Sequence, residues 1–435
     1  MKIIKYILLF SFFIETLTKS EVYFSKDISP EKIVELYKKL NIKLNGPIGL
    51  KIHSGEKNGP YFLRPSFLKN IYNYTNGTFI ECNVAYRGSR YTTDLHKELL
   101  NINGWSEYRT VIMDEFEKND ITLKVNNHHI ISENYVGEHL NDFNSCLVLS
   151  HFKGHGMGGF GGALKQLSIG FASRAGKTFI HIAGATKDYR EIWSKIAKQL
   201  DFTASLADAA STIVNYFNNK GGIAYINVLA NISKSCDCAG TWASPPKIRN
   251  IGILASTDPV AIDKACYDLI AKENNAGSQD WIRQSESKHG LNTLEKAVEH
   301  GLGSLEYDLI DIDSKDKDKS IPNKDTTQIE TISDKDSNQI EHASNASNIN
   351  LTKNESLSSA KTNTDSTISM DIKETKNKID NKKEDNSFNI ILSSIICITV
   401  IVIIIYIIFY MLKRRKKGNL VANEDLGQSS PEEKV

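Results

Sequence analysis

The sequence predicts an α/β fold in which a mixed or mostly parallel sheet is flanked by helices, and its 435 residues leave room for two subdomains. Along residues 21–312, short apolar runs typical of buried strands alternate with segments whose apolar residues recur every three or four positions. Such alternation is typical of α/β domains. Polar clusters follow several of the runs, at the strand ends where α/β sheets bind ligands.

The same patterns place the individual elements. Asp258 and Pro259 start the last helix, because aspartate caps a first turn and proline suits the first helical position. The expected helices cover residues 30–40, 190–200, 205–217 and 259–271, and the expected strands cover residues 47–53, 78–84, 145–152, 177–183, 222–232 and 251–256.

Both ends of the chain have the composition of targeting segments. Residues 1–20 show the charged start, apolar centre and polar end of a secretory signal peptide, although a buried strand would contain a similar run. Residues 390–412 carry no charge and are long enough to cross a membrane, and the basic cluster 413–417 would stay on the cytoplasmic side. We therefore expect a single-pass type I membrane protein, with its domain in a secretory lumen or outside the cell and a cytoplasmic tail of residues 413–435.

Residues 313–389 should form a disordered polar stalk. No aromatic residue and no glycine occurs between Asp308 and Ser387, so this segment cannot bury enough apolar surface to offset the entropy of ordering. Acceptor sites for N-linked glycans also occur, and they would make the protein a glycoprotein in a eukaryotic secretory pathway. These sites are Asn73, Asn76, Asn231, Asn345, Asn350 and Asn354.

Five cysteines precede the membrane segment, an odd number that leaves at least one thiol unpaired or bound to a metal. Cys236 and Cys238 are separated by one residue, so their side chains point to the same face of an extended chain. Either one of them forms a disulfide with another cysteine, or the two bind a metal ion. A bond between the two would close a very small and strained ring, so we do not expect it.

Residues 150–177 are rich in glycine, histidine and lysine. Glycine lets a backbone approach a ligand closely and leaves N–H groups free to bind an anion, whereas the alternative is a flexible surface turn. The net charge of +1 gives no reason to expect nucleic acid as a partner. We expect a site for an anionic small molecule or cofactor. Its candidate contacts here are His151, Gly158, Gly159, Gly161, Gly162 and Lys165.

Several long motifs resemble a known family. They are KIHSGEKNGPYFLRP (51–65), YRGSR (86–90), the segment 150–177, CDC (236–238), IGILASTDPVAIDKAC (251–266) and GLGSLEYDLI (301–310). Over residues 47–311 the chain resembles the family catalogued as domain of unknown function 362. Many members are described as iron–sulfur-centre proteins because a ferredoxin-like insert carries Cys-x-x-Cys motifs. This chain has no Cys-x-x-Cys, so the resemblance does not imply a ferredoxin function, and only Cys236 and Cys238 remain of that signature.

A more distant, local resemblance concerns HGMGGFGGALK, residues 155–165. It is similar to the histidine–glycine–lysine loop of the nickel-pincer lactate racemase family. The resemblance implies that His155 is an acid/base group, that Lys165 tethers a pincer cofactor, and that His181, at the matching spacing, is a nickel ligand. Ala163-Leu164 stand where that family usually has Gly-Arg before the lysine.

These residues together predict a membrane-anchored extracytoplasmic protein that binds a metal or cofactor, with nickel or iron as candidate metals. An isomerase or racemase acting on a small hydroxy or carboxylic acid needs a base near neutral pKa, such as His155, and an arginine fork for the carboxylate, from Arg87 or Arg90. The alternative for His181 is a hydrogen-bonded histidine of the protein core that binds no ligand. The alternatives are a non-catalytic iron–sulfur or metal-binding protein and a membrane-tethered binding module, so catalysis stays an open question.

Overall fold

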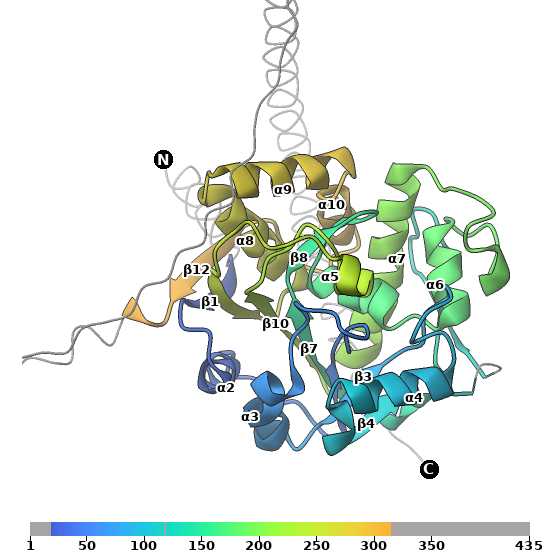
Figure 1. The fold of residues 1–435 in the computed structure, drawn as a ribbon, viewed down its shortest axis with the longest axis horizontal. Helices are drawn as coiled ribbons and strands as arrows, with labels where there is room; N and C mark the ends of the chain where they lie inside the picture. The colour runs from blue at the N-terminus through green and yellow to red at the C-terminus, as the bar shows by residue number, and fades with distance from the viewer. Residues whose placement is uncertain (1–18, 117–118, 315–435) are drawn as a thin grey trace, which may run out of the picture. The chain divides into compact units, whose positions relative to one another are not determined.

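The computed structural model describes residues 19–116 and 119–314 and is built on an eight-stranded sheet in the order β12-β1-β11-β10-β7-β2-β3-β4 (Figure 1). In this sheet β11 runs antiparallel to both neighbours, and the other strands are parallel to one another. The strands are β1 (Ser20–Ser25), β2 (Ile48–Lys51), β3 (Thr78–Glu81), β4 (Thr110–Ile112), β7 (Ser145–His151), β10 (Ile223–Leu229), β11 (Gly252–Ser256) and β12 (Tyr307–Asp311).

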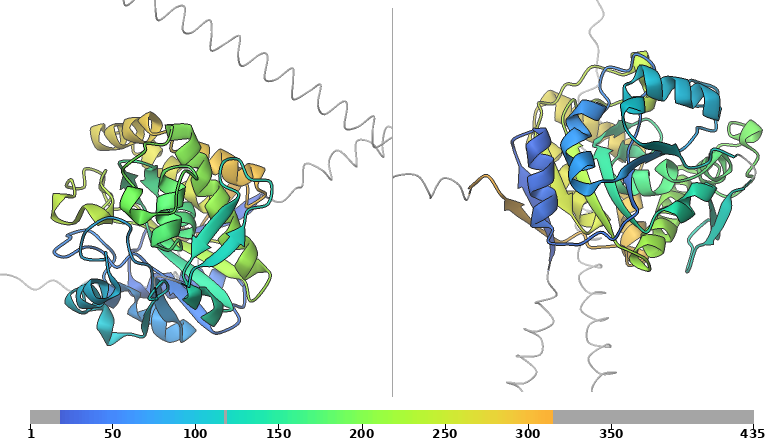
Figure 2. Two further views of the ribbon diagram at one scale, coloured as in Figure 1. Left: turned by 90° about the vertical axis from the view of Figure 1, so that its right-hand side faces the viewer. Right: turned by 90° about the horizontal axis from the view of Figure 1, so that it is seen from below.

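Helices cover both faces of this sheet, as the views in Figures 1 and 2 show. On one face, Leu36 of α2 and Leu68 of α3 belong to the same apolar core as Leu50 of β2 and Phe79 of β3. On the other face, α7 and α8 pack with the opposite side chains of the central strands. The long helices are α2 (Pro30–Lys39), α3 (Pro65–Thr75), α4 (Thr93–Ile102), α7 (Gln199–Asn218), α8 (Pro259–Lys272), α9 (Ala276–Ser287) and α10 (Asn292–Glu299).

The central strands β7 and β10 are buried along their whole length. Leu147 and Ile226 enter one apolar core while Val148 and Tyr225 enter the other. A strand covered on both faces is apolar at most positions, which is why these segments are nearly continuous apolar runs in the sequence.

Shorter elements complete the described part of the chain. Two small antiparallel pairs are formed by β5 (Ile121–Lys124) with β6 (Glu133–Val136) and by β8 (Lys153–His155) with β9 (Gly159–Gly161). The remaining helical segments are α5 (Ala163–Lys165), the π-helical turn η3 (Gln166–Gly170), α6 (Arg174–His181), and the 3-10 turns η1 (Trp105–Glu107), η2 (Glu138–Asp142), η4 (Tyr189–Glu191) and η5 (Asp237–Trp242).

The α/β class with a mostly parallel sheet and flanking helices is confirmed. Two expected elements are wrong. Residues 177–183 were expected as a strand but belong largely to helix α6, whose first turn is capped by the Ser173 hydroxyl accepting from the Gly176 N–H. Residues 190–200 were expected as a helix but are mostly loop, because Trp193 and Ile196 are 61% and 97% exposed and find no core to pack against.

The expected signal peptide (1–20), stalk (313–389), membrane segment (390–412) and cytoplasmic tail (413–435) lie almost entirely outside the described residues. At the first boundary, Ser20 is already the first residue of β1, where its hydroxyl donates to Asp258. In residues 19–116 and 119–314, no helix has both the length and the apolar character needed to cross a membrane. The three glycan acceptor sites in this part, at Asn73, Asn76 and Asn231, are exposed.

Candidate functional site

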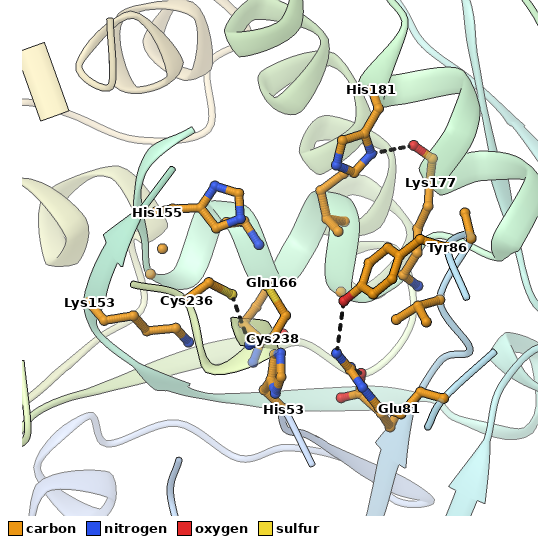
Figure 3. A pocket seen from close by; sticks show the side chains of 18 of the residues that line it. His53, Glu81, Tyr86, Lys153, His155, Gln166, Lys177, His181, Cys236 and Cys238 are labelled. Carbon is orange, nitrogen blue, oxygen red and sulfur yellow. Dashed lines mark hydrogen bonds and ion pairs between the residues drawn. The ribbon is translucent and has the colours of Figure 1, made fainter. Parts of the chain in front are cut away.

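The candidate site lies at the carboxyl ends of four adjacent parallel strands, β10, β7, β2 and β3. From β2 the chain adds β3 and β4 toward one edge of the sheet, and from β7 it adds β10 toward the other edge. The order in which strands are added therefore reverses between β2 and β7. Ligands in open α/β sheets bind at such a reversal. A cavity of about 660 Å³, partly open to solvent, occupies this position (Figure 3).

The glycine-rich segment forms one wall of the cavity through β8, β9, α5 and η3. The carboxylate of Asp263 on α8 caps α5 by accepting hydrogen bonds from the N–H groups of Ala163 and Leu164, at 2.7 and 3.0 Å. Burial raises the pKa of Asp263 to about 6, against the opposing effect of these hydrogen bonds. The cap therefore fixes where α5 presents Lys165.

A second wall comes from the loop after β10, which carries Cys236, Asp237 and Cys238. The buried Asp237 carboxylate accepts hydrogen bonds from His151 at 2.9 Å and forms an ion pair with Lys153 at 2.9 Å. Burial alone would raise the pKa of Asp237, but the neighbouring His151 and Lys153 lower it well below its usual range. Asp237 thus anchors the loop that holds the two cysteines.

Donor atoms of His155, Cys236 and Cys238 lie within 4.8 Å of one another. A hydrogen bond from the Cys238 thiol lowers the pKa of Cys236 well below its ordinary value, and Lys165 and hydrogen bonds from His155 and His53 add to this effect against burial. The Cys238 backbone N–H also points to the Cys236 sulfur, at 3.4 Å. Cys236 is therefore held as a thiolate, the form that binds metals and reacts with electrophiles.

Backbone contacts show which ring nitrogen carries the proton in each of the three histidines that line the cavity, His53, His155 and His181. In His155, Nδ1 accepts from the N–H groups of Met157 and Gly158, at 3.2 and 2.9 Å, so the proton of the neutral ring is on Nε2. In His53, Nδ1 likewise accepts from the Gly55 N–H at 3.0 Å. Both rings are therefore hydrogen-bond donors toward the Cys236 sulfur.

His181 has the opposite arrangement. Its Nδ1 donates to the Lys177 carbonyl oxygen at 2.6 Å, so Nε2 keeps its lone pair (Figure 3). Burial, together with the nearby Lys165 and His155, lowers the pKa of His181 to about 4. His181 is thus a neutral proton acceptor at pH 7, in the tautomer that also suits metal binding.

Polar groups without partners also face the cavity. No hydrogen bond or ion pair holds the Lys165 ammonium group among residues 19–116 and 119–314. The side chain of Gln166 is 7% exposed, and its Nε2 has no acceptor in the same part of the chain. Burial lowers the pKa of the neighbouring Lys177, whose ammonium group donates to the Ala172 carbonyl. A buried donor without a partner is costly, so this wall favours a ligand with acceptor atoms.

The floor of the cavity is a network of buried ion pairs. Glu81 lies 2.9 Å from the Lys51 ammonium group and 3.4 Å from the Arg90 guanidinium group, which also contacts Glu56 at 2.7 Å. Burial would raise the pKa of Glu81, but Lys51, His53 and Arg90 lower it to about 2. The Arg90 fork is therefore occupied by protein carboxylates.

The structure brings most of the expected site residues together. The lining of this cavity includes the expected residues Arg90, His155, Gly161, Gly162, Lys165, His181, Cys236 and Cys238. His181 reaches it from the end of helix α6 and not from a strand, and it lies outside the group formed by His155 and the two cysteines.

Four expected residues lie elsewhere. Arg87 is exposed and does not line the cavity, so neither arginine is placed as a clamp for a substrate carboxylate. Both ring nitrogens of His151 are occupied, Nδ1 by Asp237 and Nε2 by the Ala230 carbonyl at 2.7 Å. Gly158 and Gly159 pack against the protein: a Cβ at Gly159 would lie 2.7 Å from the Cα of Gly290. At Gly159 the absence of a side chain therefore serves packing, whereas a Cβ at Gly158 would meet only ordinary contacts, at 3.6 Å or more.

Several lining residues were not selected from the sequence: His53, Glu81, Tyr86, Lys153, Gln166 and Lys177. His53, Glu81 and Lys153 stand at or just beyond the ends of β2, β3 and β7, so the position of polar residues at strand ends is the signal that identifies them. Lys177 belongs to the glycine-, histidine- and lysine-rich segment 150–177, whereas Gln166 carries no such signal, because its place depends on how the π-helical turn folds back over the sheet.

A second group of donors, His129, Asp208 and His300, also lies within 4.8 Å. Here the Asp208 carboxylate accepts from the backbone N–H groups of His129, Ile130 and Ile131 and from His300 Nε2. Its acceptor capacity is used in holding this loop against α7 and α10, which is a structural role.

Comparisons with known proteins give a family and several distant structures. Among solved structures, the lactate racemase apoprotein from Thermoanaerobacterium thermosaccharolyticum has 13% identity and a TM-score of 0.35, covering 57% of each chain. A structural-genomics protein from Thermotoga maritima has 16% identity and a TM-score of 0.34, covering 63% of this chain and 60% of that one. The chain thus spans less than two thirds of either protein, and at these scores neither carries an argument about function.

No curated protein matches the chain. Residues 48–268 match the family described as Domain of unknown function (DUF362), in agreement with the resemblance of its motifs. The matched region covers half of the 435 residues and includes every residue that lines the cavity. The protein is therefore a member of the DUF362 family.

Proposed function

We propose that this protein binds a soft transition-metal ion through Cys236 and Cys238, with His155 as a third ligand. The observation that carries the proposal is the convergence of these three donors within 4.8 Å, in a cavity where Cys236 is held as a thiolate. Thiolate and imidazole ligands suit zinc, nickel, copper(I) and iron, whereas carboxylate-rich sites suit magnesium and calcium. The ion would supply a Lewis acid in the cavity.

Because of its tautomer, His155 contributes less to the metal affinity than the two cysteine sulfurs do. Its Nδ1 is occupied by two backbone N–H groups, so a metal at Nε2 has to displace the ring proton. We therefore expect the two sulfurs to supply most of the affinity and His155 to add a smaller part. Expected metal affinity falls with decreasing pH, because each ligand must lose its proton first.

Beside the metal, the cavity has the groups of an acid/base site for a small organic anion. The Lys165 ammonium group and the Gln166 amide supply donors, and the neutral His181 supplies a proton acceptor. Proton removal next to a carboxylate requires this combination. The proposal is an isomerase- or racemase-type enzyme that acts on a hydroxy or carboxylic acid, with Lys165 taking the carboxylate-binding role expected of Arg87 or Arg90. A non-catalytic metal-binding protein is the alternative.

Cobalt(II) titration of the full-length protein tests the metal site, because thiolate ligation gives intense near-ultraviolet charge-transfer absorption. We expect saturation at one ion per chain, loss of the absorption in Cys236→Ser and Cys238→Ser, and about tenfold weaker binding in His155→Ala. Ser235→Ala, which changes the same loop without removing a sulfur, is the matched control. Full absorption in both cysteine variants would reject the site.

Deuterium incorporation tests catalysis. Small 2-hydroxy acids are incubated with metal-loaded protein in D₂O, and exchange at the carbon next to the carboxylate is followed by NMR. We expect exchange with the unmodified protein, a loss of at least a hundredfold in His181→Asn and Lys165→Met, and unchanged metal binding in His181→Asn. Metal binding without exchange of any acid would leave the non-catalytic alternative.

For the location of the protein we keep the proposal of a single-pass type I membrane protein. Its support is the sequence pattern of residues 1–20, 390–412 and 413–417. Protease added to sealed vesicles should spare the last twenty or so residues, and removal of the C-terminal tail by external protease would overturn this topology.

A further inference from the structure

A second cavity, of about 560 Å³, adjoins the metal and acid/base cavity and is largely apolar. It lies between the glycine-rich segment, the end of α6, the loop before α7 and the start of α7. Its apolar lining consists of Met157, Ile192, Trp193, Ile196, Ala197 and Phe202.

The two cavities share a wall. His181 and Ile192 line both of them. The His181 ring stacks on Phe202 with ring centroids 5.3 Å apart and meets the edge of Trp193 at 6.3 Å. A molecule held by Lys165 in the first cavity would therefore pass His181 on its way into the second.

The loop that closes the second cavity exposes apolar side chains that no part of the described chain covers. Trp193 is 61% exposed and Ile196 is 97% exposed. The loop is nevertheless fixed at both ends: the Tyr189 ring lies 3.8 Å from the Arg174 guanidinium group, and the Gln199 amide donates to the carbonyl oxygens of Met157 and Lys288. Exposed apolar side chains on an anchored loop beside a polar site are typical of a ligand-binding groove.

The groove has few polar groups along its length: the His181 ring at the wall shared with the first cavity, the Gln199 amide and the exposed Lys195. The Gln199 amide is used by its two carbonyl acceptors, and Lys195 is the ammonium group among the lining residues. An uncharged hydrocarbon group is thus the chemical complement of this surface, and its burial would remove Trp193 and Ile196 from water.

We propose that the second cavity binds the hydrocarbon portion of the ligand whose acidic head lies at Lys165 and His181. The substrate class is then a carboxylic or 2-hydroxy acid with an aliphatic or aromatic side chain, and not the smallest acids. This inference rests on the proposed function, because it takes the head-group site from it. The continuity of the two cavities at His181 and Ile192 favours a single small molecule over a protein or a membrane as the occupant.

Calorimetric titration of the metal-loaded full-length protein with straight-chain 2-hydroxy acids of increasing length tests the proposal. Burial of each added methylene should tighten binding three- to fourfold until the groove is filled. In Trp193→Ala and Ile196→Ser the dependence on chain length should flatten, while the affinity for the shortest acid stays within about twofold. Ile102→Ser, an exposed apolar residue on α4 outside both cavities, should behave as the unmodified protein.

The outcomes separate this proposal from the one on which it rests. Equal affinity for short and long acids, abolished by Lys165→Met, would overturn the groove and leave the proposed function standing. A chain-length dependence that is unaffected by Lys165→Met would support the groove and reject the head-group site. If Trp193→Ala and Ile196→Ser instead reduce binding to phospholipid vesicles and leave the chain-length dependence intact, the surface is a membrane contact and the proposal is wrong.

Discussion

Asp263 and Gly162 are in such close contact that a Cβ on Gly162 would lie 2.3 Å from the Asp263 Oδ1 atom. That oxygen accepts the N–H of Ala163 and the Asn227 amide, both at 2.7 Å. A glycine is required here because the carboxylate of α8 occupies the space of a side chain. The contact joins the short helix that carries Lys165 to the helix behind it.

Gly162→Ala should therefore destabilise the protein by about 1 to 3 kcal/mol, since the added methyl group overpacks this contact and displaces the cap. Urea unfolding measures the loss. Gly156→Ala is the matched control, because nothing lies within 4 Å of its Cβ position and it should change the free energy of unfolding by less than about 0.5 kcal/mol. Equal effects of the two substitutions would contradict this assignment.

Arg90→Met should cost about 3 to 5 kcal/mol of unfolding free energy, because it leaves Glu56 and part of Glu81 as buried carboxylates without a cation. Arg87→Met, three residues earlier and exposed, should change it by less than about 0.5 kcal/mol. Thermal or urea unfolding compares the two. If Arg87→Met impaired the binding of acids while Arg90→Met had no effect, Arg87 would be the carboxylate-binding arginine predicted from the sequence.

His181 gives a pH dependence of stability with a defined sign. Its folded-state pKa is about 4, below the ordinary value of 6.5, so between these values the unfolded chain takes up a proton that the folded chain does not. Stability due to this group is thus fully present above pH 6.5 and is lost as the pH falls toward 4. The loss is at most about 1.4 kcal/mol per pH unit, and less here because the ring partly faces the cavity.

His181→Asn isolates this effect, because asparagine keeps a donor for the Lys177 carbonyl but does not titrate. Urea unfolding at pH 7, 6 and 5 should show the advantage of the unmodified protein over the variant shrinking with each step. An advantage that is constant or grows toward pH 5 would show that His181 is not a buried neutral histidine.

All five cysteines of the described chain should be free thiols, including Cys236 and Cys238. Alkylation in denaturant without reductant, followed by peptide mapping, should label each of Cys82, Cys146, Cys236, Cys238 and Cys266. A disulfide that links Cys236 to Cys238, or either of them to another cysteine, would contradict both the structure and the proposed metal site.

A chain that ends at Ser314 should fold, whereas one that ends at Leu305 should be strongly destabilised. The difference is β12, which pairs with β1 over five residues, and Asp313, which accepts from Ser25 and from the backbone of Lys26. Circular dichroism and thermal melting compare the two. Similar melting temperatures would show that the edge strand is dispensable.

Much of the fold could be predicted from the sequence because it is encoded locally. The buried strands β2, β3, β7, β10 and β11 are short, mostly apolar segments. Helices α2, α7 and α8 have helical spacing of apolar residues, with a serine cap at α2 and an aspartate cap at α8. The glycine-rich segment, Lys165 and the two cysteines were likewise identified by residue type and spacing.

The sequence could not decide the contacts between distant segments. The choice of helix for residues 177–181 depends on the packing of Ile180 against α7 residues such as Phe202 and Leu206. The failure of residues 190–200 to form one long helix depends on the absence of a partner surface for Trp193 and Ile196. Propensity is a weak guide where tertiary packing sets the outcome.

For the site, the sequence by itself determined which chemical groups are present, and the tertiary structure decided which of them are available. His151, Arg90 and His181 look alike in the sequence as nitrogen groups near strand ends. Both ring nitrogens of His151 are bonded, to Asp237 and to the Ala230 carbonyl. The Arg90 guanidinium group is paired with Glu56 and Glu81. His181 donates to the Lys177 carbonyl, which leaves the lone pair of its other ring nitrogen toward the cavity. The reason is physical: a polar side chain in a folded protein is defined by the partners that its neighbours in space, and not its neighbours in sequence, provide.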